Sequence, residues 1–235
     1  MQDFSAAFGL AFDLILSGDD DLAEIILLSL RVSLSAVFFA CLIGLPVGAA
    51  AAVFRFPGRG ALILFMNAMM GLPPVVVGLF IYLLLSNAGP LGVLGLLYTP
   101  TAMIIAQTVL VAPIVAALTR QVIADLHTEY DEQLRSLGLP GHRMIRTLLW
   151  DGRYSLLTVA LAGFGRAVAE VGAVIIVGGN INHVTRVMTT AIALETSKGD
   201  LGLALALGII LICLALLVNG CVMALRSTAV RAAYA

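Results

Sequence analysis

Residues 60–119 read GALILFMNAMMGLPPVVVGLFIYLLLSNAGPLGVLGLLYTPTAMIIAQTVLVAPIVAALT and contain no Asp, Glu, Lys or Arg. A transmembrane helix needs about 20 consecutive apolar residues to cross the hydrocarbon core of a bilayer, so this run is long enough for two or three crossings. Two further stretches, 32–54 and 201–225, also lack these charged residues. Helices satisfy their own backbone polar groups inside lipid. The pattern therefore predicts an all-α, polytopic membrane protein.

The composition excludes two other classes of protein. The chain has 235 residues, of which 61% are hydrophobic and 11% charged, whereas a soluble domain carries about 25% charged residues. Its charged groups are too few to cover a water-soluble globule. The formal net charge of −1 provides no positive field to attract nucleic-acid phosphates.

Basic residues decide how the apolar runs are divided. Arg55 and Arg59 precede the 60-residue run, and a cluster of arginines between 120 and 153 follows it. Cytoplasmic loops are enriched in Lys and Arg, so both flanks should be cytoplasmic and the run should cross twice. We predict five spans, over 28–53, 61–86, 101–119, 154–178 and 201–225.

This division places nine of the thirteen basic groups on the cytoplasmic side, with the N-terminus outside and the C-terminus inside. Residues 1–24 form an N-terminal interfacial segment, with an amphipathic helix expected within 3–17. Residues 89–99 become an outer loop or shallow re-entrant segment, and 226–235 a cytoplasmic tail. Pro73 and Pro74 are expected to kink the second span.

The loop 120–153 is the longest polar part of the chain and is predicted to be helical. A short helix should end at Gly138, because glycine suits the left-handed position after a helix and Pro140 bars continuation. A second helix should lead to the fourth span. The alternative is a plain solvated connector, although such a connector could be far shorter.

Glu132 and Gly138, separated by five residues, resemble the EAA motif of ABC importer permeases. Gln133 and Leu134 replace the two alanines of that motif, and Trp150-Asp151 stands where the family has Leu-Pro. Two later segments, Gly163–Ala173 (GFGRAVAEVGA) and Val177–Ile181 (VGGNI), are similar to those of oxyanion permeases, and 185–200 resembles the tungstate branch. The resemblance covers about 25–225.

The resemblance implies a type I ABC importer permease fold over 25–225 and a homodimer of permeases. It also implies two ATP-binding subunits docked on the EAA loops and an extracytoplasmic substrate-binding protein. The implied transported substrate is an oxyanion. Tungstate is the favoured substrate, and molybdate and sulfate are the alternatives. ATP and Mg would be bound by the partner ATPase. The sequence agrees that ATP is bound by another subunit. A Walker A loop needs Gly-Lys-Ser/Thr, and the chain's single lysine, Lys198, lies in Ser-Lys-Gly. No enzymatic activity, cofactor or metal is expected in this chain.

By the same resemblance, the helix around 128–138 would be the coupling helix that contacts the ATPase. Glu132 would anchor it through charge-assisted hydrogen bonds, and Gly138 would permit the turn. The candidate coupling residues are Tyr130, Glu132, Arg135, Gly138 and Pro140.

Arg166 and Glu170 are charged residues within the fourth predicted span. Four residues apart, they should share one helix face, and the cost of a charge in lipid should turn them toward the protein interior or water. They form either a transient binding site for a passing anion or a salt bridge that neutralises both charges and has a structural role. We favour the salt bridge.

The outer segment 180–200 offers donors that could exchange for the water around an oxyanion. The candidates for an outer gate are Asn180, Arg186, Thr189 and Thr190. The alternative is an ordinary interfacial helix lying over the bundle.

A stand-alone secondary transporter or channel is the rival function. Such transporters are commonly built from paired repeats, and five unequal spans do not divide into two halves. A membrane-bound enzyme is a third class, and no catalytic motif supports it.

Overall fold

The computed structural model describes residues 8–9, 12–13 and 20–234, and this part of the chain contains helices and turns but no strand. Most of the interfacial helix predicted within 3–17 lies outside the described residues. The chain divides into two compact units. Unit 1 comprises Met1–Ser35, Pro73–Gln107 and Val168–Met223, and unit 2 comprises Ala36–Leu72, Thr108–Ala167 and Ala224–Ala235.

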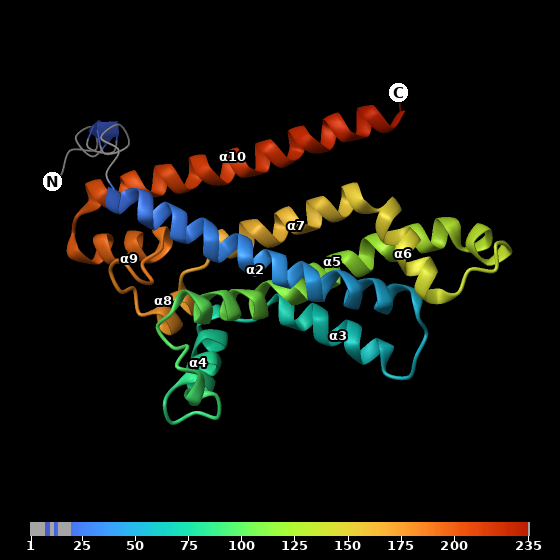
Figure 1. Ribbon diagram of the computed structural model, residues 1–235, viewed down its shortest axis with the longest axis horizontal. Helices are drawn as coiled ribbons and strands as arrows, with labels where there is room; N and C mark the ends of the chain where they lie inside the picture. Colours follow the sequence, from blue (N-terminus) through green and yellow to red (C-terminus); the bar gives the residue numbers. More distant parts are fainter. Residues whose placement is uncertain (1–7, 10–11, 14–19, 235) are drawn as a thin grey trace. The chain divides into compact units, whose positions relative to one another are not determined.

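The helices follow one another along the chain as labelled in Figure 1. They are α2 (Asp20–Val53), α3 (Arg59–Met70), α4 (Pro74–Leu85), the 3₁₀ turn η1 (Gly92–Leu94), α5 (Pro100–Ser136), α6 (Gly141–Asp151), α7 (Arg153–Val168), α8 (Gly172–Gly178), α9 (Met188–Lys198) and α10 (Leu201–Tyr234).

Three helices are long and apolar enough to cross a membrane: α2, α5 and α10. The pairs α3 with α4 and α7 with α8 also pass when each interrupted pair is counted as one span, which makes five candidates. The predicted number of about five spans agrees with that count. The fifth predicted span and the predicted tail form one helix, because α10 continues to Tyr234.

The second predicted span, 61–86, is interrupted where the two prolines lie. The helix α3 ends at Met70, and α4 begins at Pro74 with Pro73 as its extended N-cap residue. Proline has no backbone N–H and suits the first turn of a helix, so the expected kink is a complete break. The loop 89–99 contains the single turn η1.

The prediction of one continuous helix over 154–178 is wrong. The helix α7 ends at Val168 and α8 begins at Gly172, so Arg166 and Glu170 do not share one helix face. The Glu170 side chain starts the new helix, because its Oε1 accepts a hydrogen bond from the Ala173 N–H (3.0 Å). This contact satisfies one of the donors that a helix N-terminus leaves unpaired.

The prediction of a separate short helix around 128–138 is also wrong. Those residues form the last turns of α5, which runs without interruption from Pro100 to Ser136. The segment 114–136 contains no glycine or proline, so no residue there stops the helix.

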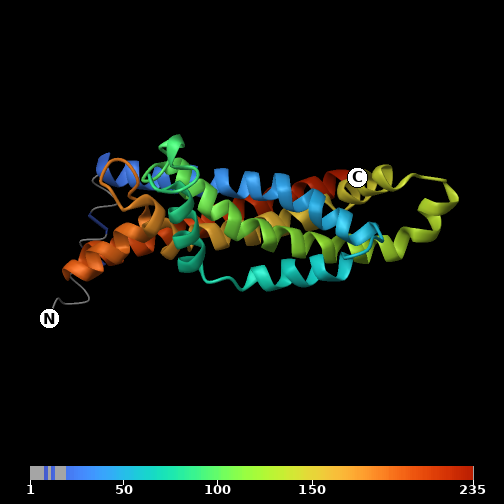
Figure 2. The same ribbon diagram turned by 90° about the horizontal axis from the view of Figure 1, so that it is seen from below.

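In unit 2, two glycines of α2 lie directly against α5. A Cβ added at Gly44 would lie 2.8 Å from Val115 Cγ1, and one at Gly48 would overlap the Ala116 carbonyl oxygen. Small residues four positions apart on a helix allow two helix backbones to approach closely. The helix α3 lies beside the same pair (Figures 1 and 2), with Met66 buried among alanines of α2 and α5.

In unit 1, α4 packs against α8 at a small residue on each helix. A Cβ at Gly78 would lie 2.7 Å from the Ala173 Cα. The loop before α5 joins this packing, since the Tyr98 N–H donates to the Val177 carbonyl (2.9 Å). These contacts hold α8 in place, and α8 positions the loop at 179–187 that follows it.

Candidate functional site

Residues 179–187 between α8 and α9, which we name the outer loop after the side predicted for them, are folded on themselves. Gly179, Asn180 and His183 all have positive φ angles, which close the chain into tight turns. The Ile181 carbonyl accepts three backbone N–H groups, from Val184, Thr185 and Arg186. The loop is therefore an ordered structure.

Thr185 is the centre of this loop, and its side chain is completely buried. Its hydroxyl donates to the Gly178 carbonyl (2.6 Å) and accepts from the Ile181 N–H (3.0 Å). One side chain thus satisfies both the last turn of α8 and the start of the loop.

The two candidate threonines lie in the first turn of α9, and both are buried. The Thr190 hydroxyl bonds the backbone of Val187 as donor (3.0 Å) and as acceptor (3.1 Å). The Thr189 hydroxyl donates to the Glu170 carbonyl (2.9 Å). Both hydroxyl protons are thus engaged, and Thr189 ties the start of α9 to the segment that joins α7 and α8.

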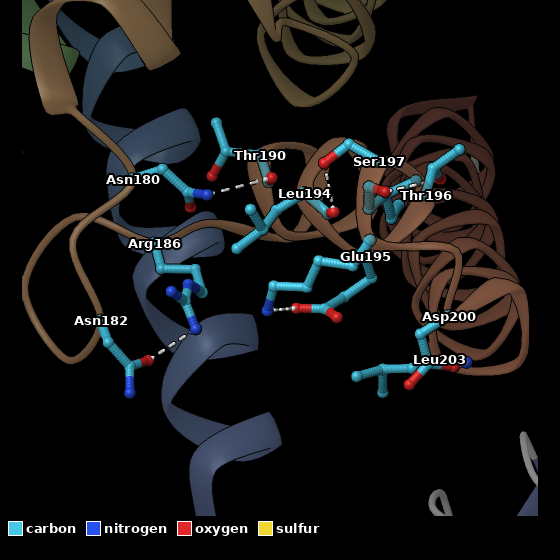
Figure 3. Close-up of polar contacts among 12 residues, drawn as sticks. Asn180, Asn182, Arg186, Thr190, Leu194, Glu195, Thr196, Ser197, Asp200 and Leu203 are labelled. Carbon is cyan, nitrogen blue, oxygen red and sulfur yellow. Dashed lines mark hydrogen bonds and ion pairs between the residues drawn. The ribbon is translucent and has the colours of Figure 1, made fainter.

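Asn180 and Arg186 are half-buried and project from the same loop, as Figure 3 shows. The Asn180 amide donates to the Thr190 carbonyl (3.4 Å), and Arg186 Nη1 donates to Asn182 Oδ1 (2.9 Å). Asn180 Oδ1 and Arg186 Nε are buried and have no hydrogen-bond partner within the described structure. This pair therefore retains unused polar atoms, unlike the two threonines.

His183 connects the outer loop to the beginning of α2. Its Nδ1 lies 2.8 Å from Glu24 Oε2 and 4.0 Å from Asp21 Oδ1. The hydrogen bond to Glu24 and then its negative charge raise the pKa of His183. Ligand atoms of the three residues lie within 4.8 Å of one another, and a His–carboxylate hydrogen bond accounts for the arrangement.

The two candidates predicted within the fourth span, Arg166 and Glu170, differ in burial and in the unit to which they belong. Glu170 is in unit 1 and only 3% exposed, whereas Arg166 is in unit 2 and half-buried. Glu170 acts as a local helix cap, which the sequence did not indicate.

At the other candidate site, α5 ends in a Schellman motif. The Leu139 N–H donates to the Leu134 carbonyl (3.3 Å), and Gly138 has a φ of +63°. This confirms the left-handed position predicted for Gly138, although the helix ends two residues earlier, at Ser136.

The coupling candidates are spread over the end of α5 and the turn into α6. Glu132 and Pro140 are exposed, and Tyr130 is half-buried. The side chain of Arg135 lies outside the described part of the structure. Leu137 is 72% exposed, so the turn presents an apolar side chain to its surroundings.

Ser29 on α2 is a positioning residue that the sequence analysis missed. Its hydroxyl donates to the Ile25 carbonyl (2.6 Å) and accepts from the Met188 N–H at the start of α9 (2.8 Å). The two residues are 159 positions apart, so no local pattern could have revealed the contact.

The candidate spans, the ordered loop at 179–187 and the polar loop at 120–153 are features of a polytopic membrane protein. The family model for the binding-protein-dependent transport system inner membrane component matches residues 44–228. The chain therefore belongs to this family, the permease subunits of ABC importers. In this family ATP hydrolysis belongs to a partner ATPase, and a substrate-binding protein completes the transporter.

Individual relatives match over most of their length. The tungstate uptake system permease protein TupB of Peptoclostridium acidaminophilum is 37% identical over 226 residues, which cover 96% of this chain and 99% of the relative. A probable anion ABC transporter permease protein of Haloferax volcanii is 38% identical, over 84% of this chain and 88% of its own. TupB of Campylobacter jejuni is 39% identical, over 71% of this chain and 70% of its own. Sulfate transport permeases are more distant.

Proposed function

We propose that this permease moves tungstate across the cytoplasmic membrane, driven by a separate ATPase. The observation that carries the substrate assignment is the end-to-end similarity to a relative named for tungstate uptake, over 96% of this chain and 99% of that one. The likeness includes the outer loop, where the residues nearest to an entering anion would lie.

At the outer loop, Asn180 and Arg186 are the residues proposed to meet the anion. The Arg186 Nε donor is buried without a hydrogen-bond partner in the described structure, so it would be available to an anion. The Asn180 amide has a second N–H besides the one that donates to the Thr190 carbonyl. Thr189 and Thr190 would contribute indirectly by fixing the start of α9, because their hydroxyls already bond the backbone. The Arg186 guanidinium would supply positive charge that attracts a dianion.

Arg166 and Glu170 are proposed to have structural roles in the pathway. The cap that Glu170 provides to α8 supports this reading for the carboxylate. Arg166, near the end of α7, stays a candidate for anion passage.

At the cytoplasmic loop, the end of α5 is proposed to dock on the ATPase. Glu132 is exposed and would form a charge-assisted hydrogen bond with a basic partner, which contributes about 1.5–3 kcal/mol. Tyr130, Arg135, Gly138 and Pro140 would shape the rest of the contact. ATP and Mg would bind to the ATPase.

The assembly we propose has two copies of this permease, two ATPases and an outer binding protein. The proposed orientation places the N-terminus outside and the C-terminus in the cytoplasm. The nine basic residues assigned to cytoplasmic segments support this orientation.

The experiment is uptake in cells that lack their own oxyanion importers and express the complete transporter. We expect tungsten accumulation that excess tungstate abolishes and that equimolar molybdate or sulfate reduces only weakly. Glu132→Ala should lower both ATPase co-purification and uptake, whereas exposed Glu129→Ala, one helix turn away, should change neither. Preferential uptake of molybdate or sulfate would overturn the substrate assignment, and uptake without the ATPase would favour a stand-alone transporter.

A further inference from the structure

The helix α6 has two different faces, both within unit 2. Met144 and Leu148 are buried on its inner face. At its end, a Cβ added at Gly152 would lie 2.9 Å from the Leu126 side chain of α5. The inner face is therefore held against α5, and this fixes the direction in which the opposite face points.

The opposite face carries a hollow of about 690 Å³ in which basic and aromatic side chains meet. Its lining residues are His142, Ile145, Arg146, Thr147, Leu149 and Trp150. Trp150 is 68% exposed, although it is the chain's single tryptophan and among the largest apolar groups available for burial. A large exposed aromatic ring beside an exposed arginine indicates a binding surface.

Arg153 connects this face to the beginning of α7. Its guanidinium carbon lies 4.8 Å from the centre of the Trp150 ring and 4.6 Å from that of Tyr154. Its Nη1 also donates to the Trp150 carbonyl (2.7 Å), which caps the end of α6. These contacts hold a positive charge between two aromatic rings.

The position of these residues along the chain is that of a membrane interface. From Ser155 to Gly165 the sequence has no charged residue, and it enters the interrupted candidate span formed by α7 and α8. Tryptophan and tyrosine are enriched at the level of lipid headgroups, where one side of the ring is apolar and the other is wet. Arg143, Arg146 and Arg153 all lie just before this boundary.

We propose that the face of α6 bearing Arg146 and Trp150, together with Arg153, binds the phosphate headgroup of an anionic phospholipid in the cytoplasmic leaflet. The proposal rests on the orientation given under Proposed function. Arg146 would pair with the phosphate, and the Trp150 ring would lie along the glycerol and upper acyl chain. Each basic residue near an anionic membrane surface strengthens attraction about fivefold.

A lipid fits this face better than the ATPase does. The proposed ATPase contact is formed around the acidic Glu132, which calls for a basic partner. The face of α6 carries Arg146 and Trp150, and Tyr154 lies nearby at the start of α7. If the ATPase covers this face of α6 instead, the test below gives a different result.

The single tryptophan makes the proposal directly measurable. The assembled transporter would be placed in nanodiscs containing phosphatidylcholine with either brominated phosphatidylglycerol or brominated phosphatidylcholine. The fluorescence of Trp150 is obtained by subtracting the fluorescence of the Trp150→Phe complex from that of the wild-type complex. This subtraction cancels the fluorescence of the other subunits. We expect brominated phosphatidylglycerol to quench this signal several-fold more than brominated phosphatidylcholine, and high salt to reduce the difference.

Arg146→Gln should reduce the preference for phosphatidylglycerol about fivefold. The matched control is Arg55→Gln, which removes the same charge at an exposed position on the same proposed side of the membrane. Equal quenching by the two lipids, or an equal loss in both variants, would refute a specific headgroup site. No quenching by either lipid would mean that a protein covers Trp150, which also overturns the proposal. Tungstate uptake is measured separately, so a failed substrate assignment leaves this result interpretable.

Discussion

The outer loop and the loop 120–153, which we propose to be cytoplasmic, use their polar residues in opposite ways. In the outer loop and the first turn of α9, Thr185, Thr189 and Thr190 are buried and their hydroxyls bond the backbone. In the cytoplasmic loop, Glu132, Leu137 and Trp150 are exposed to the surroundings. One loop is stabilised from within, whereas the other presents side chains for contact.

This difference indicates how each loop should respond to substitution. Removing a group from the outer loop should unfold or loosen the loop itself, because each hydroxyl has partners that cannot readily find water. Changing the cytoplasmic loop should leave the fold largely intact and weaken association with a neighbour. Three substitutions test the contrast, from the largest expected effect to the smallest.

Thr185→Val should have the largest effect on the outer loop. It keeps the shape of the side chain but removes the hydroxyl that bonds the Gly178 carbonyl and the Ile181 N–H. We expect a loss of about 2–3 kcal/mol in stability, measured as a lower Tm of the purified transporter. Thr196→Val is the control, because Thr196 is exposed and bonds only its own helix. Equal Tm values for the two variants would contradict the internally stabilised loop.

Gly138→Val should act mainly on association. A β-branched residue at a φ of +63° costs about 1–2 kcal/mol, and no neighbouring atom lies near the position. We expect the turn after α5 to shift and ATPase co-purification to fall, with a smaller decrease in Tm than in Thr185→Val. Gly60→Ala is the control, since Gly60 lies in α3 at an ordinary φ and in open space. Normal assembly and transport by Gly138→Val would refute the coupling role.

The contact between His183 and Glu24 should have the smallest effect, since both side chains are exposed. Glu24 raises the pKa of His183 in the folded state, so the contact stabilises the fold fully below the unfolded pKa of about 6.5. That contribution should disappear as the pH rises through the raised pKa. The Tm difference between wild type and His183→Gln should therefore shrink from pH 6 to pH 8. A difference that is constant or grows with pH would show that the contact has no such role.

Local signals predicted the parts of the fold that local chemistry determines. The left-handed turn at Gly138 and the end of α2 at Val53 follow from residue types and spacing, and so does the place of the interruption at Pro73 and Pro74, where only a kink was predicted. The five-span arrangement came from the placement of arginines, which requires no knowledge of packing.

The interruption between α7 and α8 could not be predicted in this way. The residues Ala169, Glu170 and Val171 include no helix breaker. The interruption is accompanied by the Thr189 hydroxyl bonding the Glu170 carbonyl from 19 residues away. Likewise, Ser29 meets Met188 across 159 residues. Such distant contacts depend on the packed fold, and no window of sequence contains both partners.

The uninterrupted helix α5 has a mechanical consequence. Between Ile114 and Ser136 it has no glycine or proline, the residues at which helices commonly bend. At 1.5 Å per residue this segment is a rod about 35 Å long, and Glu132 lies near its free end. A displacement imposed at Glu132 meets no compliant joint over this length, so the helix transmits force along its axis rather than absorbing it.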